Sequence, residues 1–406
     1  MRKIYTCLDI GSFNIKLMVV ENINNSFHVL AATNTRTKGF SKGYITDKDE
    51  FLKSLLKAKI SVEELLGIEI NKTLVVIPSV GLDFSIVSED HEFKNKKDIT
   101  TNDIDLVKSK IVKYHSEKGK KIITISPISF HISGKDVKDP LGQTSEFLAL
   151  KAVVTSSPTE YLSEIVTVIE ESGFKVVSLG YQTLGDYYEA KTKAMDKEKT
   201  AVINLGHEMM EVAIFNKGIM IKNERIDFGT NILENDIARI YNLKKSVARS
   251  LKENFAVSNT RYASTDKISV VDKTDTTLSL SQLEISEIAE SRIMEMLKLA
   301  KKQINVLTNR EISYIIITGG ITELTGFSYT VENVFDRRAQ IMNVNTIGAR
   351  NNIYSSCLGM IKYFVNKNEF SSKKISMFDE KQISDLSNNN GEVDNNIINK
   401  VFDYFN

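Results

Sequence analysis

Apolar residues in this chain group into short runs and into helical stripes. Apolar runs at residues 4–8 and 15–20 flank a glycine-containing turn, a pattern that predicts a β-hairpin. A third strand is expected over 27–34 and a buried strand over 73–78. Between them, residues 47–66 carry leucines on one broad face, which predicts a helix. The N-terminal part is therefore expected to form an α/β layer, a sheet covered by a helix.

The same alternation continues to about residue 365. Over 81–151, short stretches of alternating apolar and polar residues surround one helix, which predicts an inserted small α+β subdomain. The strand–turn–strand pattern of the N-terminus is repeated over 200–221. Further helices are expected at 102–116, 159–172, 182–193, 236–241, 244–255, 281–306 and 355–364, and further strands at 84–88, 122–126, 147–154, 175–181, 201–205, 211–215, 219–222 and 313–318. One theme repeated in two halves indicates a duplication.

Three glycine-bearing turns, each after a β-like run, lie at residues 8–12, 203–207 and 316–320. Glycine lets the backbone approach a ligand closely, and amides at strand ends cradle phosphate. Their spacing suggests two related halves that close over one phosphorylated ligand, as in the actin-like nucleotide-binding proteins. We therefore expect an α/β, actin-like (ribonuclease H-like) duplicated fold of two lobes with the inserted α+β subdomain.

The length of 406 residues allows two or more domains. The expected parts are a first lobe core (1–80 and 152–198), the inserted subdomain (81–151), a second lobe core (199–228 and 313–365), its outer subdomain (229–312), a disordered linker (366–392) and an amphipathic helix (393–406).

Composition narrows the class of protein. The chain has 53 Lys and Arg against 52 Asp and Glu, a formal net charge of +1, so no global field draws it to nucleic acid. The two cysteines, Cys7 and Cys357, are expected to be buried reduced thiols. Asp9 and Lys16 interrupt the N-terminal apolar run before a signal peptide can form, and no stretch is long and apolar enough to span a bilayer. We expect the protein to stay in the cytosol.

The first glycine turn carries candidate phosphate chemistry. Asp9 precedes Gly11, Ser12 offers a hydroxyl, and Lys16 offers a cation within one hairpin. A carboxylate beside a triphosphate requires Mg²⁺ or its water shell between them, because the bare groups repel each other. Asp9 is therefore a candidate metal residue that acts through water. The alternative is an ordinary hairpin in which Asp9 caps amides and Lys16 faces solvent.

The second turn departs from this chemistry. Asn204 stands where an acid would hold a metal-bound water or a nucleophile, and Asn can hydrogen-bond a hydrated metal but cannot accept a proton. We therefore expect binding with weak or absent hydrolysis, and the catalytic residues are unknown. His207 is not expected to ligate metal, because no second His or Cys lies at a suitable spacing. Glu208 either holds metal or points away.

The last residues are expected to form an amphipathic helix that follows the polar linker. In a helix with about 100° of rotation per residue, the apolar side chains of this segment fall within an arc of roughly 160°. They are Ile397, Ile398, Val401, Phe402, Tyr404 and Phe405. Such a helix can lie in a membrane surface, although docking onto the globular body is the alternative. Its charges give no attraction to anionic lipid, so stable attachment would need many copies acting together in a polymer.

With these residues, the chain resembles the FtsA family of actin-like bacterial division proteins. Residues 39–47 are similar to the family's glycine-basic-glycine segment, and 138–142 with 147–155 are similar to its characteristic inserted subdomain. The expected nucleotide-binding residues are Asp9, Gly11, Ser12, Phe13, Asn14, Lys16, Asn204, Gly206, His207, Lys252, Thr318, Gly319 and Gly320. Arg249 stands where the family usually has a ribose-binding Glu, and Ile321 where it commonly has a third glycine.

The resemblance implies ATP and Mg²⁺ as ligands, the metal being held through water by Asp9 and Asn204. It also implies filament formation, the tubulin-like ring protein FtsZ as a partner on residues 229–312, and attachment to the inner face of the cell membrane at the division site. In this reading Ile397, Ile398, Val401, Phe402 and Phe405 contact membrane lipid. Two alternatives stay open, a related scaffold of pilus assembly and a small-molecule phosphotransferase of the same fold.

Overall fold

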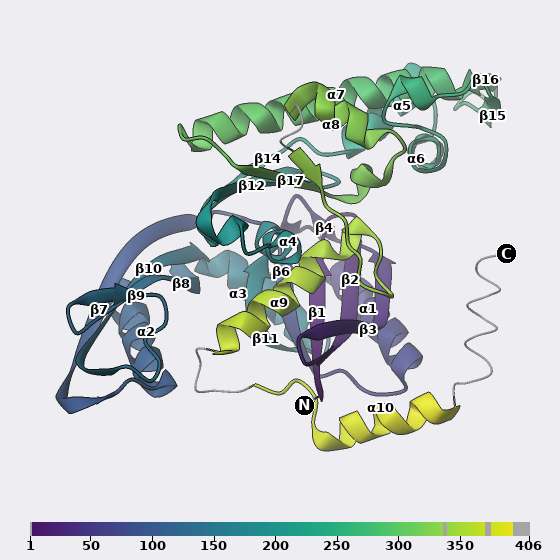
Figure 1. The fold of residues 1–406 in the computed structure, drawn as a ribbon. Coiled ribbons are helices and arrows are strands. Elements are labelled where there is room, and N and C mark those ends of the chain that lie inside the picture. The colour runs from purple at the N-terminus through teal and green to yellow at the C-terminus, as the bar shows by residue number, and fades with distance from the viewer. Residues whose placement is uncertain (1, 336–338, 370–374, 393–406) are drawn as a thin grey trace.

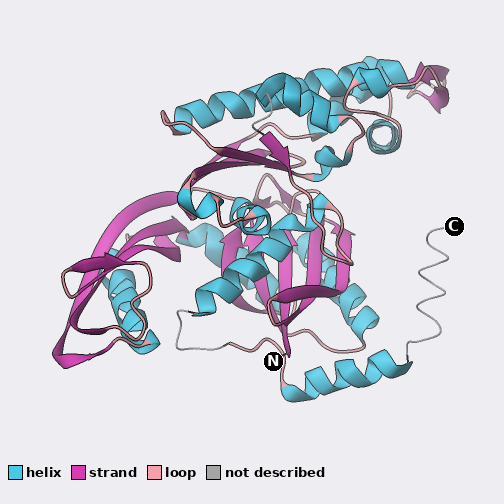
Figure 2. Ribbon diagram, in the orientation of Figure 1, coloured by secondary structure: helices cyan, strands magenta, loops and turns pink. Residues whose placement is uncertain are grey.

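The structure is a computed structural model that describes residues 2–335, 339–369 and 375–392. Two lobes are each built on a five-stranded sheet, and a smaller subdomain extends sideways from the first lobe (Figure 1). Figure 2 shows that helices and sheets alternate in layers through both lobes. None of the described helices is long and apolar enough to cross a membrane.

The first lobe has the strand order β11–β6–β1–β2–β3. Its strands are β1 (Arg2–Ile10), β2 (Asn14–Ile23), β3 (Ser26–Arg36), β6 (Lys72–Ile77) and β11 (Lys175–Tyr181). The first three form an antiparallel meander, and β6 and β11 continue the sheet in parallel with β1. The predicted hairpin is confirmed, and its register pairs Asp9 with Lys16.

Helices cover both faces of this sheet. The helices α1 (Lys48–Leu66) and α3 (Thr159–Glu171) pack together on one face, and α4 (Gln182–Ala190) and α9 (Ser355–Glu369) lie on the other (Figure 1). Helix α1 begins where the Asp47 carboxylate accepts a hydrogen bond from the backbone N–H of Glu50, and it ends at Gly67 with a φ of 67°. A two-stranded loop, β4 (Phe40–Ser41) and β5 (Tyr44–Ile45), precedes α1.

The second lobe repeats the same topology. Its strand order is β14–β13–β12–β17–β18. The strands are β12 (Lys199–Leu205), β13 (Met210–Asn216), β14 (Ile219–Ile226), β17 (Tyr314–Thr318) and β18 (Ala339–Ile341). Again an antiparallel meander is followed by parallel strands, and Asn204 occupies the register position next to Thr318. The duplication that the sequence predicts is therefore present in the fold.

Two smaller units complete the molecule. The inserted subdomain has β7 (Asp83–Asp98), α2 (Thr101–His115), β8 (Lys120–Ile132), β9 (Lys135–Val137) and β10 (Thr144–Pro158) around its own apolar core. The outer part of the second lobe has α5 (Asn231–Ile240), α6 (Lys245–Asn254), β15 (Lys267–Val271), β16 (Thr277–Ser281), α7 (Gln282–Leu307) and α8 (Phe327–Phe335). Helix α5 begins before the predicted 236, and the polar stretch 258–276 contains β15, because pairing with β16 compensates for its few apolar residues.

The expectation of a disordered linker over 366–392 is wrong for its described residues. Helix α9 continues to Glu369, and α10 (Glu380–Glu392) lies beneath the first lobe in Figure 1. Met377, Phe378 and Leu386 are buried in the first lobe's core. A few apolar residues are enough to dock this segment, because they are buried in the core of the first lobe while the polar residues between them face solvent.

The two helices that connect the lobes cross at very short range. A side chain on Gly359 of α9 would overlap the carbonyl oxygen of Gly185 in α4, and a side chain on Gly185 would overlap that of Ser356. Both obstacles are backbone atoms, which cannot move aside. Only glycine fits at this crossing, and the crossing fixes how the lobes are joined.

Candidate functional site

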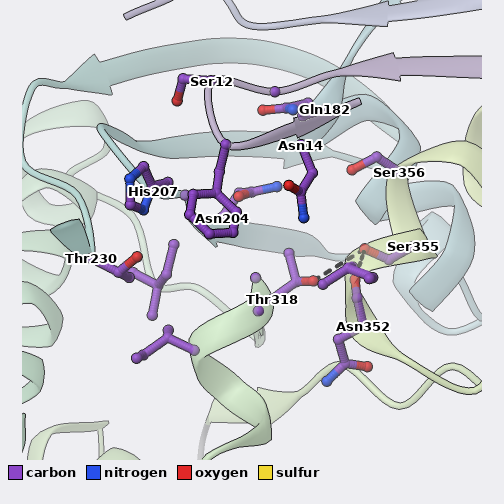
Figure 3. A pocket seen from close by; sticks show the side chains of 18 of the residues that line it. Ser12, Asn14, Gln182, Asn204, His207, Thr230, Thr318, Asn352, Ser355 and Ser356 are labelled. Atoms are coloured by element: carbon purple, nitrogen blue, oxygen red, sulfur yellow. Dashed lines mark hydrogen bonds between the residues drawn. The ribbon is translucent and has the colours of Figure 1, made fainter. Parts of the chain in front are cut away.

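A cavity of about 350 Å³ lies where the three glycine turns of the two lobes meet. Its wall includes every residue that the sequence analysis assigned to nucleotide binding: Asp9, Gly11, Ser12, Phe13, Asn14, Lys16, Asn204, Gly206, His207, Lys252, Thr318, Gly319 and Gly320. Figure 3 shows side chains from both lobes around this cavity, among them Ser12, Asn204 and Thr318. The fold thus brings together residues as far apart in the chain as Asp9 and Gly320.

Glycine is required within the first two turns, and also where the third turn approaches the second. A Cβ atom on Gly11 would lie 2.9 Å from the carbonyl oxygen of Asn14, and one on Gly206 would lie 2.5 Å from that of Met209. Gly319 has a φ of +115°, and a side chain there would overlap the carbonyl oxygen of Leu205. Larger residues would strain the turns and fill the cavity.

The first turn holds a buried ion pair. Asp9 is 1% exposed, and its Oδ2 lies 2.8 Å from the Nζ of Lys16. Its Oδ1 accepts a 2.8 Å hydrogen bond from the side-chain amide of Gln182, the first residue of α4. Burial alone would lower the pKa of Lys16, but the Asp9 carboxylate outweighs it and raises that pKa. Lys16 therefore carries its positive charge at the cavity wall.

The second turn is backed by a buried acid. The Nδ2 of Asn204 donates a 2.6 Å hydrogen bond to Asp186, which is fully buried in α4. The hydroxyls of Ser355 and Ser356, at the start of α9, donate to the same carboxylate. Burial raises the pKa of Asp186 to about 7, although these donors act in the opposite direction.

A second buried ion network lies on the outer side of the cavity. Glu234 of α5 is fully buried and accepts hydrogen bonds from Lys252 (2.6 Å) and Arg249 (3.0 Å) of α6. Burial alone would raise the pKa of Glu234, but the hydrogen bonds from these two cations lower it. Arg249, which replaces the acid expected at its position, is thus accommodated by an acid on the neighbouring helix.

Side chains bridge the two lobes at the rim. The ring of Phe13, from the first lobe, lies 4.4 Å from that of His207, and the guanidinium of Arg36 lies 3.5 Å over the Phe13 ring. The Glu208 carboxylate accepts hydrogen bonds from the Ser41 hydroxyl (2.9 Å) and the backbone N–H of Lys42 (2.7 Å). Glu208 therefore ties the lobes together in this structure, a role that the sequence did not indicate.

His207 should make folding stability depend on pH. Burial, assisted by Lys252 and other nearby cations, lowers the pKa of His207 to about 3. Below about pH 6.5, His207 binds a proton in the unfolded chain but stays neutral in the folded chain. The free energy of unfolding therefore decreases as pH falls below that value. From about pH 7 to about pH 5, we expect His207→Gln to lose about 2 kcal/mol less stability than the wild type, measured by urea unfolding.

The pH dependence of stability must be compared between variants, because protonation of Asp186 changes stability in the opposite direction from protonation of His207. Its raised pKa makes the folded state bind the extra proton, so its contribution to stability rises as pH falls through about 7. His28→Gln, at an exposed position of β3, is the matched control and should keep the wild-type pH slope. Equal slopes for His207→Gln and the wild type would contradict the prediction.

The chemistry of the wall fits a hydrated magnesium ion and a phosphate chain. Asp9 provides a carboxylate and Asn204 a carbonyl oxygen, and Mg²⁺ commonly keeps several waters while it binds one or two carboxylates and substrate phosphates. Lys16 offers the cation. Within the residues that the structure describes, no cluster of three or more His, Cys, Asp or Glu could hold a metal by itself.

Several residues of the site escaped the sequence analysis. They are Gln182, Asp186, Glu234, Ser355 and Ser356. The detectable signal for two of them is an acid within the buried stripe of a helix, since Asp186 lies between Leu184 and Tyr187, and Glu234 follows Leu233. The predicted membrane residues Ile397, Ile398, Val401, Phe402 and Phe405 lie outside the described residues.

Comparison with known proteins identifies relatives of the chain. The family model for the cell division protein FtsA matches residues 201–359. The cell division protein FtsA of Enterococcus faecalis is 22% identical over 377 residues, covering 90% of this chain and 84% of the relative. That of Bacillus subtilis is 22% identical over 381 residues, covering 92% and 86%. That of Streptococcus pneumoniae is 24% identical over 378 residues, covering 88% and 79%.

Solved structures confirm the fold. The PilM–PilN type IV pilus biogenesis complex matches with a TM-score of 0.58 at 12% identity, covering 88% of this chain and 96% of that chain. MreB5 of Spiroplasma citri bound to ADP matches with a TM-score of 0.54 at 12% identity, covering 91% and 99%. At these identities the likeness concerns the fold alone, which is actin-like as the sequence predicts.

Proposed function

We propose that this chain, a relative of the bacterial cell division protein FtsA with the actin-like fold, is an ATP-binding, polymerising adaptor. It would anchor the FtsZ division ring to the inner face of the cytoplasmic membrane. The observation that carries the proposal is the convergence of all three glycine turns on one cavity between the lobes. Structural neighbours in complex with ADP and AMPPNP support a nucleotide as the ligand.

The proposed roles follow from the chemistry of each side chain. Lys16 neutralises phosphate charge, and the glycines leave room for the phosphates beside the backbone. Asp9 and Asn204 hold Mg²⁺ through its waters, and the metal supplies neutralisation of the phosphate oxygens. Asn204 cannot accept a proton, so we propose that the protein uses ATP for assembly with weak or absent hydrolysis.

Titration calorimetry with ATP and Mg²⁺ tests the proposed ligand. We expect saturable binding of one nucleotide, weakened when Mg²⁺ is removed by a chelator. A cavity that binds no nucleotide would refute the proposal. Rapid turnover that depends on a small hydroxylated substrate would instead favour the phosphotransferase alternative, although Asn204 cannot act as the general base which that reaction requires.

The membrane anchor is tested by Phe402→Asp, which places a charge in the apolar arc of the terminal segment. We expect the full-length variant to lose co-sedimentation with liposomes, because a charge opposes burial of that face in the lipid interface. Binding should fall to the level of a chain that ends at Glu392. That truncation keeps the buried Met377, Phe378 and Leu386, whereas a cut near Asn366 would remove part of the core.

Asn399→Asp is the matched control, because it adds the same charge on the polar side of the predicted helix. It should retain most of the wild-type binding, and both variants should unfold at the wild-type temperature. Equal pelleting of Phe402→Asp and the wild type would contradict the anchor. It would favour the pilus-assembly alternative, which lacks such a segment.

Partner and assembly need separate experiments. Electron microscopy of the protein on a lipid monolayer with ATP should show filaments. Full-length FtsZ should be recruited to liposomes only when this protein is present. If FtsZ binds the liposomes equally well with and without this protein, the adaptor role is contradicted, whereas the proposal of nucleotide binding is not affected.

A further inference from the structure

The buried acid behind the second turn is not explained by the fold alone. Asp186 has no solvent exposure, yet its carboxylate faces three side chains of the cavity wall. Its Oδ1 accepts from the hydroxyls of Ser355 (2.6 Å) and Ser356 (2.9 Å), and its Oδ2 accepts from the Nδ2 of Asn204 (2.6 Å). Burying a carboxylate has a large desolvation free energy. Neutral hydrogen-bonding groups would link two helices with a smaller desolvation penalty if the link were purely structural.

The position of Asp186 complements what the second turn lacks. The two lobes repeat one hairpin, and Asp9 and Asn204 occupy equivalent places in it, each at the end of its central strand. The first hairpin therefore has a carboxylate at the cavity, and the second has an amide with a carboxylate directly behind it. The acid missing from the turn is present one hydrogen bond further from the cavity.

This arrangement fixes which end of the amide faces the cavity. In its ionised form Asp186 can only accept hydrogen bonds, so the NH₂ group of Asn204 turns toward it, as the 2.6 Å contact shows. The carbonyl oxygen then points away, and it lies 4.0 Å from where a Cβ on Gly206 would stand. Ser355, which donates to Asp186, also lies 3.1 Å from the Thr318 hydroxyl of the third turn (Figure 3). Asp186 thus organises polar groups from two of the turns.

We propose that Asp186 is a positioning residue for magnesium: it presents the Asn204 oxygen to the hydrated ion and supplies the negative charge that the second turn has lost. The inference rests on the proposed binding of ATP with Mg²⁺. It predicts that the carboxylate and the amide can exchange places, because the swapped pair conserves both the hydrogen bond and the charge.

The test compares Asp186→Asn, Asn204→Asp and the double variant, each in the full-length protein. Calorimetry measures ATP affinity with Mg²⁺ and with a chelator, and the ratio of the two affinities reports the contribution of the metal. Asp186→Asn should reduce this ratio by about 10- to 100-fold, the usual effect of losing a partner that orients a metal-binding group. The double variant should restore the ratio, and Asp186→Asn should keep the wild-type affinity for ATP without metal.

Thermal unfolding of the ligand-free variants provides a second readout. Asn204→Asp places two carboxylates within hydrogen-bonding distance and should lower the unfolding temperature, whereas the double variant should recover it. Asp196→Asn, a half-exposed carboxylate outside the cavity, is the control and should change neither readout.

The outcomes separate the two claims. If the wild type binds ATP with Mg²⁺ and Asp186→Asn keeps the wild-type metal ratio, Asp186 is a structural link only and the inference is overturned. A double variant no better than Asp186→Asn also overturns it. Absence of ATP binding by the wild type overturns the proposed function together with this inference.

Discussion

Lys16→Met should destabilise the protein by about 3 to 5 kcal/mol, because it leaves the buried Asp9 carboxylate without its cation. The same change removes the positive charge from the cavity wall, so ATP affinity should fall as well. Urea unfolding measures the first effect and calorimetry the second. Lys53→Met, at an exposed position of α1, is the control and should leave both stability and ATP affinity at the wild-type level.

A second substitution separates the ion pair from other effects. Adding Asp9→Asn to Lys16→Met removes the unpaired charge, so part of the lost stability should return. ATP binding should not return, because both proposed ligand contacts are then absent. Retention of wild-type stability by Lys16→Met would show that Asp9 does not need its partner.

Gly359→Ala should cost at least about 3 kcal/mol of stability and disturb the cavity. The added methyl group would overlap the carbonyl oxygen of Gly185, so α9 must move away from α4. Both helices begin at the cavity, with Gln182 and Ser355 as their first residues. Displacing the crossing therefore displaces the Asp9 and Asp186 networks together. Thermal unfolding and ATP titration are the measurements.

Asn366→Ala is the matched control in the same helix, because Asn366 is exposed. It should change stability by no more than about 0.5 kcal/mol. Gly185→Ala should resemble Gly359→Ala, since it meets the backbone of Ser356 from the other side of the crossing. If both glycine variants unfold as the wild type does, the helices have more room than the structure shows.

The predictable part of this molecule is its local pattern. The hairpin turns around Gly11 and Gly206 and the strand before Gly319 are set by neighbouring residues, so the sequence located them and the cavity they line. Helix α1 was predicted to within one residue, because an Asp N-cap and a Gly C-cap flank its apolar stripe. Signals of this kind act over a few positions of the chain.

The unpredicted part depends on partners that are distant in sequence. Asp186 meets Ser355 across 169 positions, and Glu208 meets Ser41 across 167. No local pattern indicates such pairings, because they arise only when the two lobes are assembled. The segment around Phe378 was missed for the same reason, since its order comes from burial against a lobe made by the N-terminal half.

The docked segment also limits how far the body can stand from a bilayer. Because Met377, Phe378 and Leu386 are buried against the first lobe, the chain is held to that lobe as far as α10, well beyond residue 366. If the proposed anchor at 393–406 binds lipid, its closeness in sequence to α10 would keep the lipid near the face that α10 covers and restrict rotation of each subunit. Copies attached in this way would share one orientation on the membrane before any contact forms between them.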